Sequence, residues 1–191
     1  MEDNRSMALA IRLLSETDFE PFGTMLGKPY PKAPDPAAFS NAATDFWQEH
    51  LFDAGPGGEV EILWVNYWNP DLSIGVFENH LLTEQAVAPL IGSITQVVAL
   101  SGPDGLPDRS TAKAFLIEPG QGVCMNPGVW HATRSGGSTC LMLTRRSTTL
   151  ALVAQLNQLP HADETILYDL GDQPIRIELQ CLRPDEEGTR S

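Results

Sequence analysis

From residue 59 onward the chain consists of short apolar runs, rich in Val, Ile, Leu and aromatic residues, that end at turn signals. The runs are EVEILWVNYW, LSIGVFENHLL, ITQVVAL, KAFLIEP, GVCMNP and TCLMLTRR, and the intervening turns are NPD, GPDGLPD, PGQG and SGG. Short strands at this spacing predict an antiparallel sandwich or barrel. Each run is far shorter than the ~18 apolar residues that a membrane-spanning helix needs.

The N-terminal part carries different signals. Residues 8–14 (ALAIRLL) predict a strand, and Ser15 with Asp18 three residues later predicts the cap of a short helix that Gly23 ends. Residues 27–39 contain four prolines, which exclude a helix or a central strand and predict an extended loop.

The remaining segments complete a single domain. Residues 147–160 (STTLALVAQLNQLP) have helical or mixed character, and the sequence from residue 183 is polar. We therefore expect one domain over residues 8–182, with flexible ends at residues 1–7 and 183–191.

The charge balance narrows the choice of partners. The chain has 25 acidic and 12 basic residues, a formal net charge of -13. Such a surface repels phosphate backbones and anionic lipids, so we expect neither nucleic acid nor a membrane as a partner. An anionic substrate would need local cations. We interpret Asp71, Glu84 and the acidic residues 185–187 as solvated.

The cysteines and the N-terminus favour a cytoplasmic protein. Cys124, Cys140 and Cys181 are odd in number and form no CxxC pair, so they predict small buried apolar side chains in a reducing compartment. The N-terminus has no basic start followed by a long apolar run, which predicts that there is no signal peptide.

Two stretches place chemically active side chains close together. In VFENHLLTEQAVAPLIG (residues 76–92), Glu78 and His80 are two residues apart and share one face of a strand. A turn at residues 82–84 would bring Gln85 back beside His80. In GQGVCMNPGVWHATRSGG, a Pro-Gly turn precedes His131. The alternative interpretations are a buried structural histidine for His131 and an ordinary exposed strand face for Glu78 and His80.

This spacing resembles the two cupin motifs. Glu78 and His80 stand where the first motif has two histidines, Gln85 stands where it has a carboxylate, and NPGVWH matches the Pro-Gly-turn histidine of the second motif. In the cupin barrel both motifs line one interior cavity. The resemblance therefore places His131 opposite Glu78, His80 and Gln85.

Over residues 8–150 the chain is similar to the ureidoglycolate lyase family. The stretches LAIRLLSETDFEPFG, FENHLLTEQAVAPL and STAKAFLIEPGQGVCMNPGVWH carry this resemblance. It implies a mostly β, cupin-like (RmlC-like) antiparallel barrel or sandwich with a few short helices. It also implies a lyase acting on a C–N bond, of the amidine-lyase type, that splits ureidoglycolate into glyoxylate and urea in allantoin and purine catabolism.

The chain departs from the family pattern at five positions. Trp68 and Asn79 stand where the family has arginine, Asn126 and Ala132 stand where it has histidine, and Thr144 stands where aspartate is common. These departures leave the identity of the substrate undetermined. The alternatives are a related cupin enzyme for another small hydroxy acid and a small-carboxylate-binding cupin without catalysis.

The resemblance and the proton-transfer chemistry together predict a site. We expect His131 to act as the base, His80 as an acid or orienting group, and Glu78 to hold an imidazole tautomer. The predicted substrate-binding residues are Gln85, Asn126, Lys113, Trp130 and Arg145.

A metal and a second subunit are the remaining expectations. His80, Gln85 and His131 are the predicted ligands of any divalent metal. Glutamine is a poor ligand for first-row metals, so we expect a weak metal site or none. Because barrels of this type expose open sheet edges and commonly cover them by pairing, we expect a homodimer.

Overall fold

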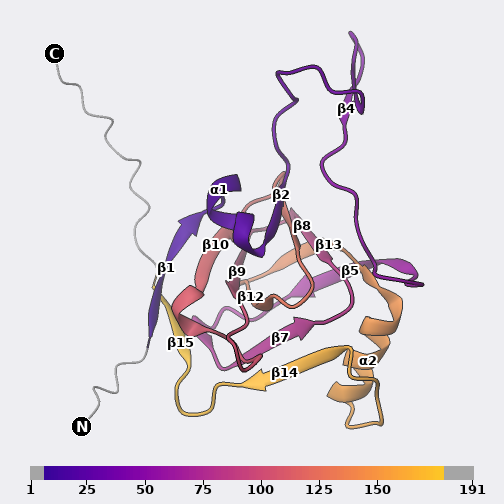
Figure 1. The fold of residues 1–191 in the computed structure, drawn as a ribbon. Coiled ribbons are helices and arrows are strands. Elements are labelled where there is room, and N and C mark those ends of the chain that lie inside the picture. The colour runs from indigo at the N-terminus through magenta and orange to yellow at the C-terminus, as the bar shows by residue number, and fades with distance from the viewer. Residues whose placement is uncertain (1–6, 179–191) are drawn as a thin grey trace, which may run out of the picture.

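The computed structural model describes residues 7–178, and strands are the predominant secondary structure of this part of the chain (Figure 1). Nearly all of the predicted flexible ends, Cys181 and the acidic residues 185–187 lie outside the described residues. The strands are β1 Ala8–Leu13, β2 Gly23–Leu26, β3 Ala38–Ser40, β4 Asp45–Trp47, β5 Val60–Tyr67, β6 Ser73–Ile74, β7 Val76–His80, β8 Gln85–Ile91, β9 Ile94–Ala99, β10 Lys113–Ile117, β11 Gly122–Met125, β12 Trp130–Arg134, β13 Ser138–Arg145, β14 Thr165–Asp169 and β15 Ile175–Glu178. The helices are α1 Glu16–Phe19, α2 Arg146–Leu156 and the 3₁₀ turns η1 Glu20–Phe22 and η2 Arg109–Thr111.

Two sheets form a curled barrel. One has the strand order β14-β7-β12-β9-β10-β1-β15-β6, and the other has the order β2-β11-β8-β13-β5. All strand pairs between residues 59 and 146 are antiparallel, while β1 runs parallel to β10 and β15. The predicted mostly β, cupin-like barrel with a few short helices is therefore confirmed.

Two apolar clusters occupy the two faces of the larger sheet. Between the sheets, Ile94 and Phe115 pack with Val87 and Met142 of the smaller sheet. On the other face of the larger sheet, Phe77 and Trp130 cluster with apolar residues of β1, β6 and β15, which are strands of the same sheet. This arrangement follows from strand alternation, because β7, β9, β10 and β12 bury both of their faces.

The N-terminal signals formed as predicted. Ser15 caps α1, because its Oγ atom accepts a hydrogen bond from the Asp18 amide at 3.3 Å, and Gly23 ends η1 with φ 147°. Beyond β2 the chain leaves the barrel as a long arm that carries the β3–β4 hairpin (Figure 1). The segment 147–160 begins within α2, whose 11 residues are too few to cross a bilayer, and no other described helix is long and apolar enough to do so.

The glycine turn that precedes β12 is hydrogen-bonded to the end of β7, so it holds together the two strands that carry the motifs. β7 and β12 are antiparallel neighbours in which His131 lies directly opposite Glu78. The Gly128 amide donates to the His80 carbonyl oxygen at 2.8 Å, and the Asn79 side-chain amide donates to the Gly128 oxygen at 3.0 Å. Gly128 has φ 83°, in the left-handed region that glycine adopts without strain. The turn therefore fixes His131 beside the end of β7.

An aromatic cluster closes the barrel below α1. The Phe115 ring lies 5.4 Å from Phe19 and 6.3 Å from Phe22 between ring centroids, and all three side chains are fully buried.

We predict that Phe115→Ala lowers the free energy of unfolding by about 3–5 kcal/mol, measured by urea denaturation, because it leaves a cavity in this cluster. The matched control is Leu13→Ala on neighbouring β1, where the side chain is 59% exposed, and it should change stability by less than ~0.5 kcal/mol. Equal losses in the two variants would contradict this account of the core.

Candidate active site

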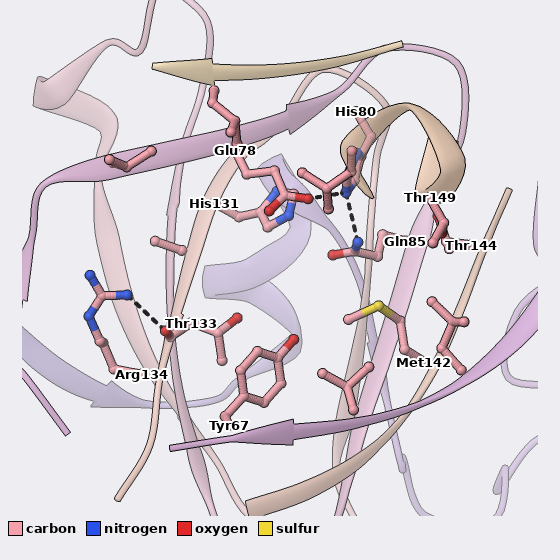
Figure 2. Close-up of a pocket in the computed structure, with 16 residues that line it drawn as sticks. Tyr67, Glu78, His80, Gln85, His131, Thr133, Arg134, Met142, Thr144 and Thr149 are labelled. Carbon is pink, nitrogen blue, oxygen red and sulfur yellow. Dashed lines mark hydrogen bonds and ion pairs between the residues drawn. The ribbon is translucent and has the colours of Figure 1, made fainter. Parts of the chain in front are cut away.

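A cavity of about 380 Å³ opens between the two sheets, with α2 at one side (Figure 2). This volume suits a small molecule. The cavity is lined by apolar residues of both sheets and by a group of polar residues that face one another. The lining residues are Leu63, Val65, Tyr67, Val76, Glu78, His80, Gln85, His131, Ala132, Thr133, Arg134, Met142, Thr144, Thr149, Leu152 and Leu167.

Four of the predicted residues meet in this cavity. Strand alternation on β7 directs Glu78 and His80 inward, and Gln85 begins β8 directly across from them (Figure 2). The ring centroids of His80 and His131 are 5.1 Å apart. Both histidines are buried, so a small molecule in the cavity could contact both rings.

His80 is held through both ring nitrogens. Its Nδ1 atom lies 3.0 Å from Thr165 Oγ1, and its Nε2 atom lies 2.8 Å from Glu78 Oε1 and 2.8 Å from the Gln85 amide nitrogen. Nε2 cannot donate to Glu78 and accept from Gln85 at the same time. Because the two ends of an amide are assigned from their partners, a protonated Nε2 requires Gln85 to present its oxygen to His80.

Among the described residues, only one ring nitrogen of His131 has a hydrogen-bond partner. Its Nδ1 atom lies 3.1 Å from the Val129 carbonyl oxygen, which can only accept a hydrogen bond. The proton of a neutral ring is therefore on Nδ1, and the lone pair of Nε2 is available. This is the tautomer that a general base requires.

The environment moves the pKa values of two of these groups. Burial lowers the pKa of His131 to about 4; the Glu78 carboxylate opposes this change, whereas the charge on His80 adds to it. Burial also acts to raise the pKa of Glu78, but the hydrogen bond from His80 and the charges of both histidines outweigh it, and the pKa lies below its usual value. At neutral pH the cavity therefore combines a carboxylate with a neutral His131.

Several hydroxyl groups in this region were missed from the sequence. Thr165 contacts His80 from β14, which is 85 residues further along the chain, and only tertiary pairing brings it there. Tyr67, Thr133 and Thr149 line the cavity without any motif to mark them. Thr144, noted above only as a departure from the family, has a buried hydroxyl with no hydrogen-bond partner among the described residues.

Four predicted substrate-binding residues lie away from the cavity. Asn126 is exposed beyond β11, and Trp130 faces the opposite side of β12, where its indole nitrogen donates to Ser101 Oγ at 3.0 Å. The Lys113 ammonium lies beside Asp18 and over the ring of Phe22. Strand alternation explains Trp130, because its neighbour His131 takes the inward position.

Arg145 holds a loop instead of lining the cavity. Its Nη1 atom donates to the Ala54 carbonyl oxygen at 3.0 Å, and its Nε atom donates to Ser147 Oγ at 2.7 Å. Among the residues that line the cavity, Arg134 is the one lysine or arginine. Two of its nitrogens already donate to the backbone oxygens of Thr133 and Ser73, and its Nε atom is buried without a partner in the described chain.

The interpretation of Glu84 as a solvated residue is wrong. Only 8% of this residue is exposed, and its carboxylate is bound by the His50 ring and by the Asp53 amide. The loop before β5 covers it, and the local sequence does not reveal that long-range contact. Cys124 and Cys140 are buried free thiols, as predicted.

The donor set of the cavity suits a divalent metal. The ligand atoms of Glu78, His80 and His131 all lie within 4.8 Å of one another. Two imidazoles and one carboxylate are a donor set that Mn, Fe or Zn accepts. The carboxylate of Glu78 is a better third donor than the predicted Gln85 amide.

The fold and this site define a cupin-like barrel with an internal histidine and carboxylate group. Residues 6–158 match the family described as ureidoglycolate lyase. The chain belongs to the ureidoglycolate lyase family.

Individual relatives match shorter segments. A ureidoglycolate lyase of Schizosaccharomyces pombe is 39% identical over 64 residues, covering 31% of this chain and 34% of that protein. A ureidoglycolate lyase of Escherichia coli (strain K12 / DH10B) is 41% identical over 63 residues, covering 33% and 39%. A relative from Agrobacterium fabrum is 30% identical over 112 residues, covering 58% and 63%. These matches therefore span less than two thirds of each relative.

Solved structures give a more distant similarity. A dTDP sugar isomerase from Desulfovibrio desulfuricans G20 has a TM-score of 0.41 and 12% identity, covering 71% of this chain and 81% of that one.

The low pKa of His131 makes stability depend on pH. Between the unfolded value near 6.5 and the folded value of about 4, the unfolded chain binds the proton that folded His131 does not. Stability should therefore fall by about 3 kcal/mol as the pH drops through this window. We predict that His131→Asn removes most of this loss, measured by urea denaturation between pH 7 and 4. His161→Asn, at an exposed histidine, should leave the slope unchanged, and the same slope in all three proteins would contradict the assignment.

Proposed function

We propose that this chain is a ureidoglycolate lyase that cleaves a C–N bond to release glyoxylate and urea. The observation that carries the proposal is the pair of buried histidines 5.1 Å apart, with Glu78 on one of them, facing a small cavity in a member of this family. The reaction needs a base, an acid and hydrogen-bond donors, but no covalent nucleophile. The site offers each of these groups.

In this proposal His131 Nε2 removes the proton from the substrate hydroxyl. The oxygen lone pair forms the new carbonyl bond, and the electron pair of the broken C–N bond moves to the departing nitrogen. That nitrogen takes the Nε2 proton of a His80 that enters the reaction as the imidazolium. The products are neutral urea and glyoxylate with its original carboxylate, and the step leaves His80 neutral and His131 protonated. Burial makes His131 a weak base, and the Glu78 carboxylate partly restores its basicity.

The other polar residues would orient the substrate. Glu78 keeps a proton on His80 Nε2 through its 2.8 Å contact, and Gln85 can turn its amide toward either His80 or the urea group. The Thr144 hydroxyl, which has no partner within residues 7–178, would bond to the substrate after a rotation of its side chain. A divalent metal held by Glu78, His80 and His131 would occupy the ring nitrogens that serve here as base and acid, so it would take the place of this proton transfer and supply positive charge for a substrate carboxylate.

The departures from the family pattern favour a second candidate. Thr144, which stands where aspartate is common in the family, lines the cavity. A related cupin enzyme for another small hydroxy acid is therefore the alternative. Activity of the purified protein on ureidoglycolate, with and without added divalent metal, separates the two.

We predict that His131→Asn lowers kcat on ureidoglycolate by ~10²-fold or more, because an amide can form hydrogen bonds but cannot carry the proton. Urea release above the spontaneous rate is the measurement. His161→Asn is the control at an exposed histidine and should keep full activity. Full turnover in His131→Asn, with the pH profile of the unchanged protein, would make His131 a structural residue.

We also propose that the chain is a cytoplasmic homodimer. Free buried thiols at Cys124 and Cys140 suit a reducing compartment. β5 is an edge strand whose outer face exposes apolar side chains, with Ile62 at 69% and Trp64 at 67%. A row of this kind is a typical site for pairing between copies.

We predict that Trp64→Glu shifts the protein from dimer to monomer at micromolar concentration, because a charge would then lie within the paired apolar face. Light scattering gives the mass. Leu13→Glu, at a comparably exposed position on β1, is the control and should remain dimeric. A monomeric mass for the unchanged protein would contradict the proposal.

A further inference from the structure

A second group of donor side chains lies outside the barrel. Cys124 is on β11 between Val123 and Met125, which both face the interior, so its thiol faces the opposite side of the sheet. Glu84 precedes the inward-facing Gln85 and likewise points outward. The loop between β4 and β5 crosses this surface and brings His50 over both residues.

Contacts other than those of His50 hold this loop in place. The Glu84 amide donates to the Asp53 carbonyl oxygen at 3.0 Å, and the Asp53 amide donates to Glu84 Oε2 at 2.7 Å. The Arg145 guanidinium binds the Ala54 carbonyl oxygen. The donor group is therefore part of an ordered connection between the loop and the sheet.

The three side chains converge on one point. His50 Nε2 lies 2.9 and 2.8 Å from the two carboxylate oxygens of Glu84, and the Cys124 thiol lies 3.7 Å from Oε2. All the ligand atoms lie within 4.8 Å of one another. Glu84 and Cys124 are buried, whereas the His50 side chain is 26% exposed.

We propose that His50, Glu84 and Cys124 bind a zinc-type divalent cation. An imidazole, a carboxylate and a thiolate are the three donor types that Zn²⁺ takes in proteins. Tetrahedral bonds of 2.0–2.3 Å place neighbouring donors about 3.3–3.6 Å apart. The distances of 2.8, 2.9 and 3.7 Å between the donor atoms lie below and above that range. Small side-chain rotations would therefore bring the donors into tetrahedral geometry.

The charge and the chemical type of the three donors favour a zinc-type cation. A neutral imidazole, a carboxylate and a thiolate carry two negative charges together, which a divalent cation neutralises at a largely buried position. The cation binds the thiolate, so it would displace the thiol proton of Cys124 on binding. The thiolate favours Zn²⁺ over Mg²⁺, Ca²⁺ or Mn²⁺.

The site would lie one residue from the cavity. Glu84 faces the metal and Gln85 faces His80, so the ion would tie the loop to the strand that presents Gln85. The exposed side of His50 leaves the fourth position to water. This proposal does not depend on which reaction the cavity supports.

Cobalt is a probe that distinguishes this site from the cavity, because the group formed by Glu78, His80 and His131 contains no sulfur. Metal-free protein titrated with Co²⁺ should develop a sulfur-to-cobalt charge-transfer absorption in the near ultraviolet. Cys124→Ser should abolish this absorption. Cys140→Ser, at the other buried thiol among the described residues, should retain it.

His50→Gln is a second test that keeps the thiol and alters a partly exposed loop residue. It should raise at least tenfold the Co²⁺ concentration that half-saturates the sulfur absorption, a signal to which the sulfur-free cavity group does not contribute. His161→Gln is its control. Absence of the sulfur absorption in the unchanged protein, its persistence in Cys124→Ser, or an unchanged half-saturating Co²⁺ concentration in His50→Gln would each overturn the proposal.

Discussion

The hydrogen bond from the Gly128 amide to the His80 carbonyl oxygen is the contact on which the site depends. It joins the turn before β12 to the end of β7 and sets the register in which His131 lies opposite Glu78. A shift of one residue would turn His131 to the outer face and bring Trp130 into the cavity. The turn is possible because Gly128 adopts a left-handed conformation that side chains disfavour.

The same register determines how charge is distributed among the side chains in the cavity. Two imidazoles in an apolar barrel cannot both be charged at low cost, and burial leaves His131 neutral while Glu78 stays ionised beside His80. The acid and the base of the proposed reaction are therefore distinguished by their surroundings, since both are histidines. The hydrogen bonds to Val129 and Thr165 then fix the orientation of each ring.

The two faces of the smaller sheet have different chemistry. Gln85 and Met142 face the cavity, while Glu84 and Cys124 face the loop that carries His50. Glu84 directly precedes the inward-facing Gln85, and Cys124 lies between the inward-facing Val123 and Met125 of β11, so alternation places these neighbours on opposite faces. The outer cluster thus adjoins the cavity without opening into it.

The sequence by itself determined the β-barrel class, the strand that carries Glu78 and His80, and the Pro-Gly turn before His131. Alternating apolar residues, turn signals and a Pro-Gly turn are local features whose consequences do not depend on distant parts of the chain. The tertiary structure decided which other groups join them. Thr165 reaches His80 from β14, and the covering loop buries Glu84, because strand pairing and loop packing link residues that no local pattern connects. Lys113 and Arg145, plausible from charge alone, were directed by packing to Asp18 and to Ala54.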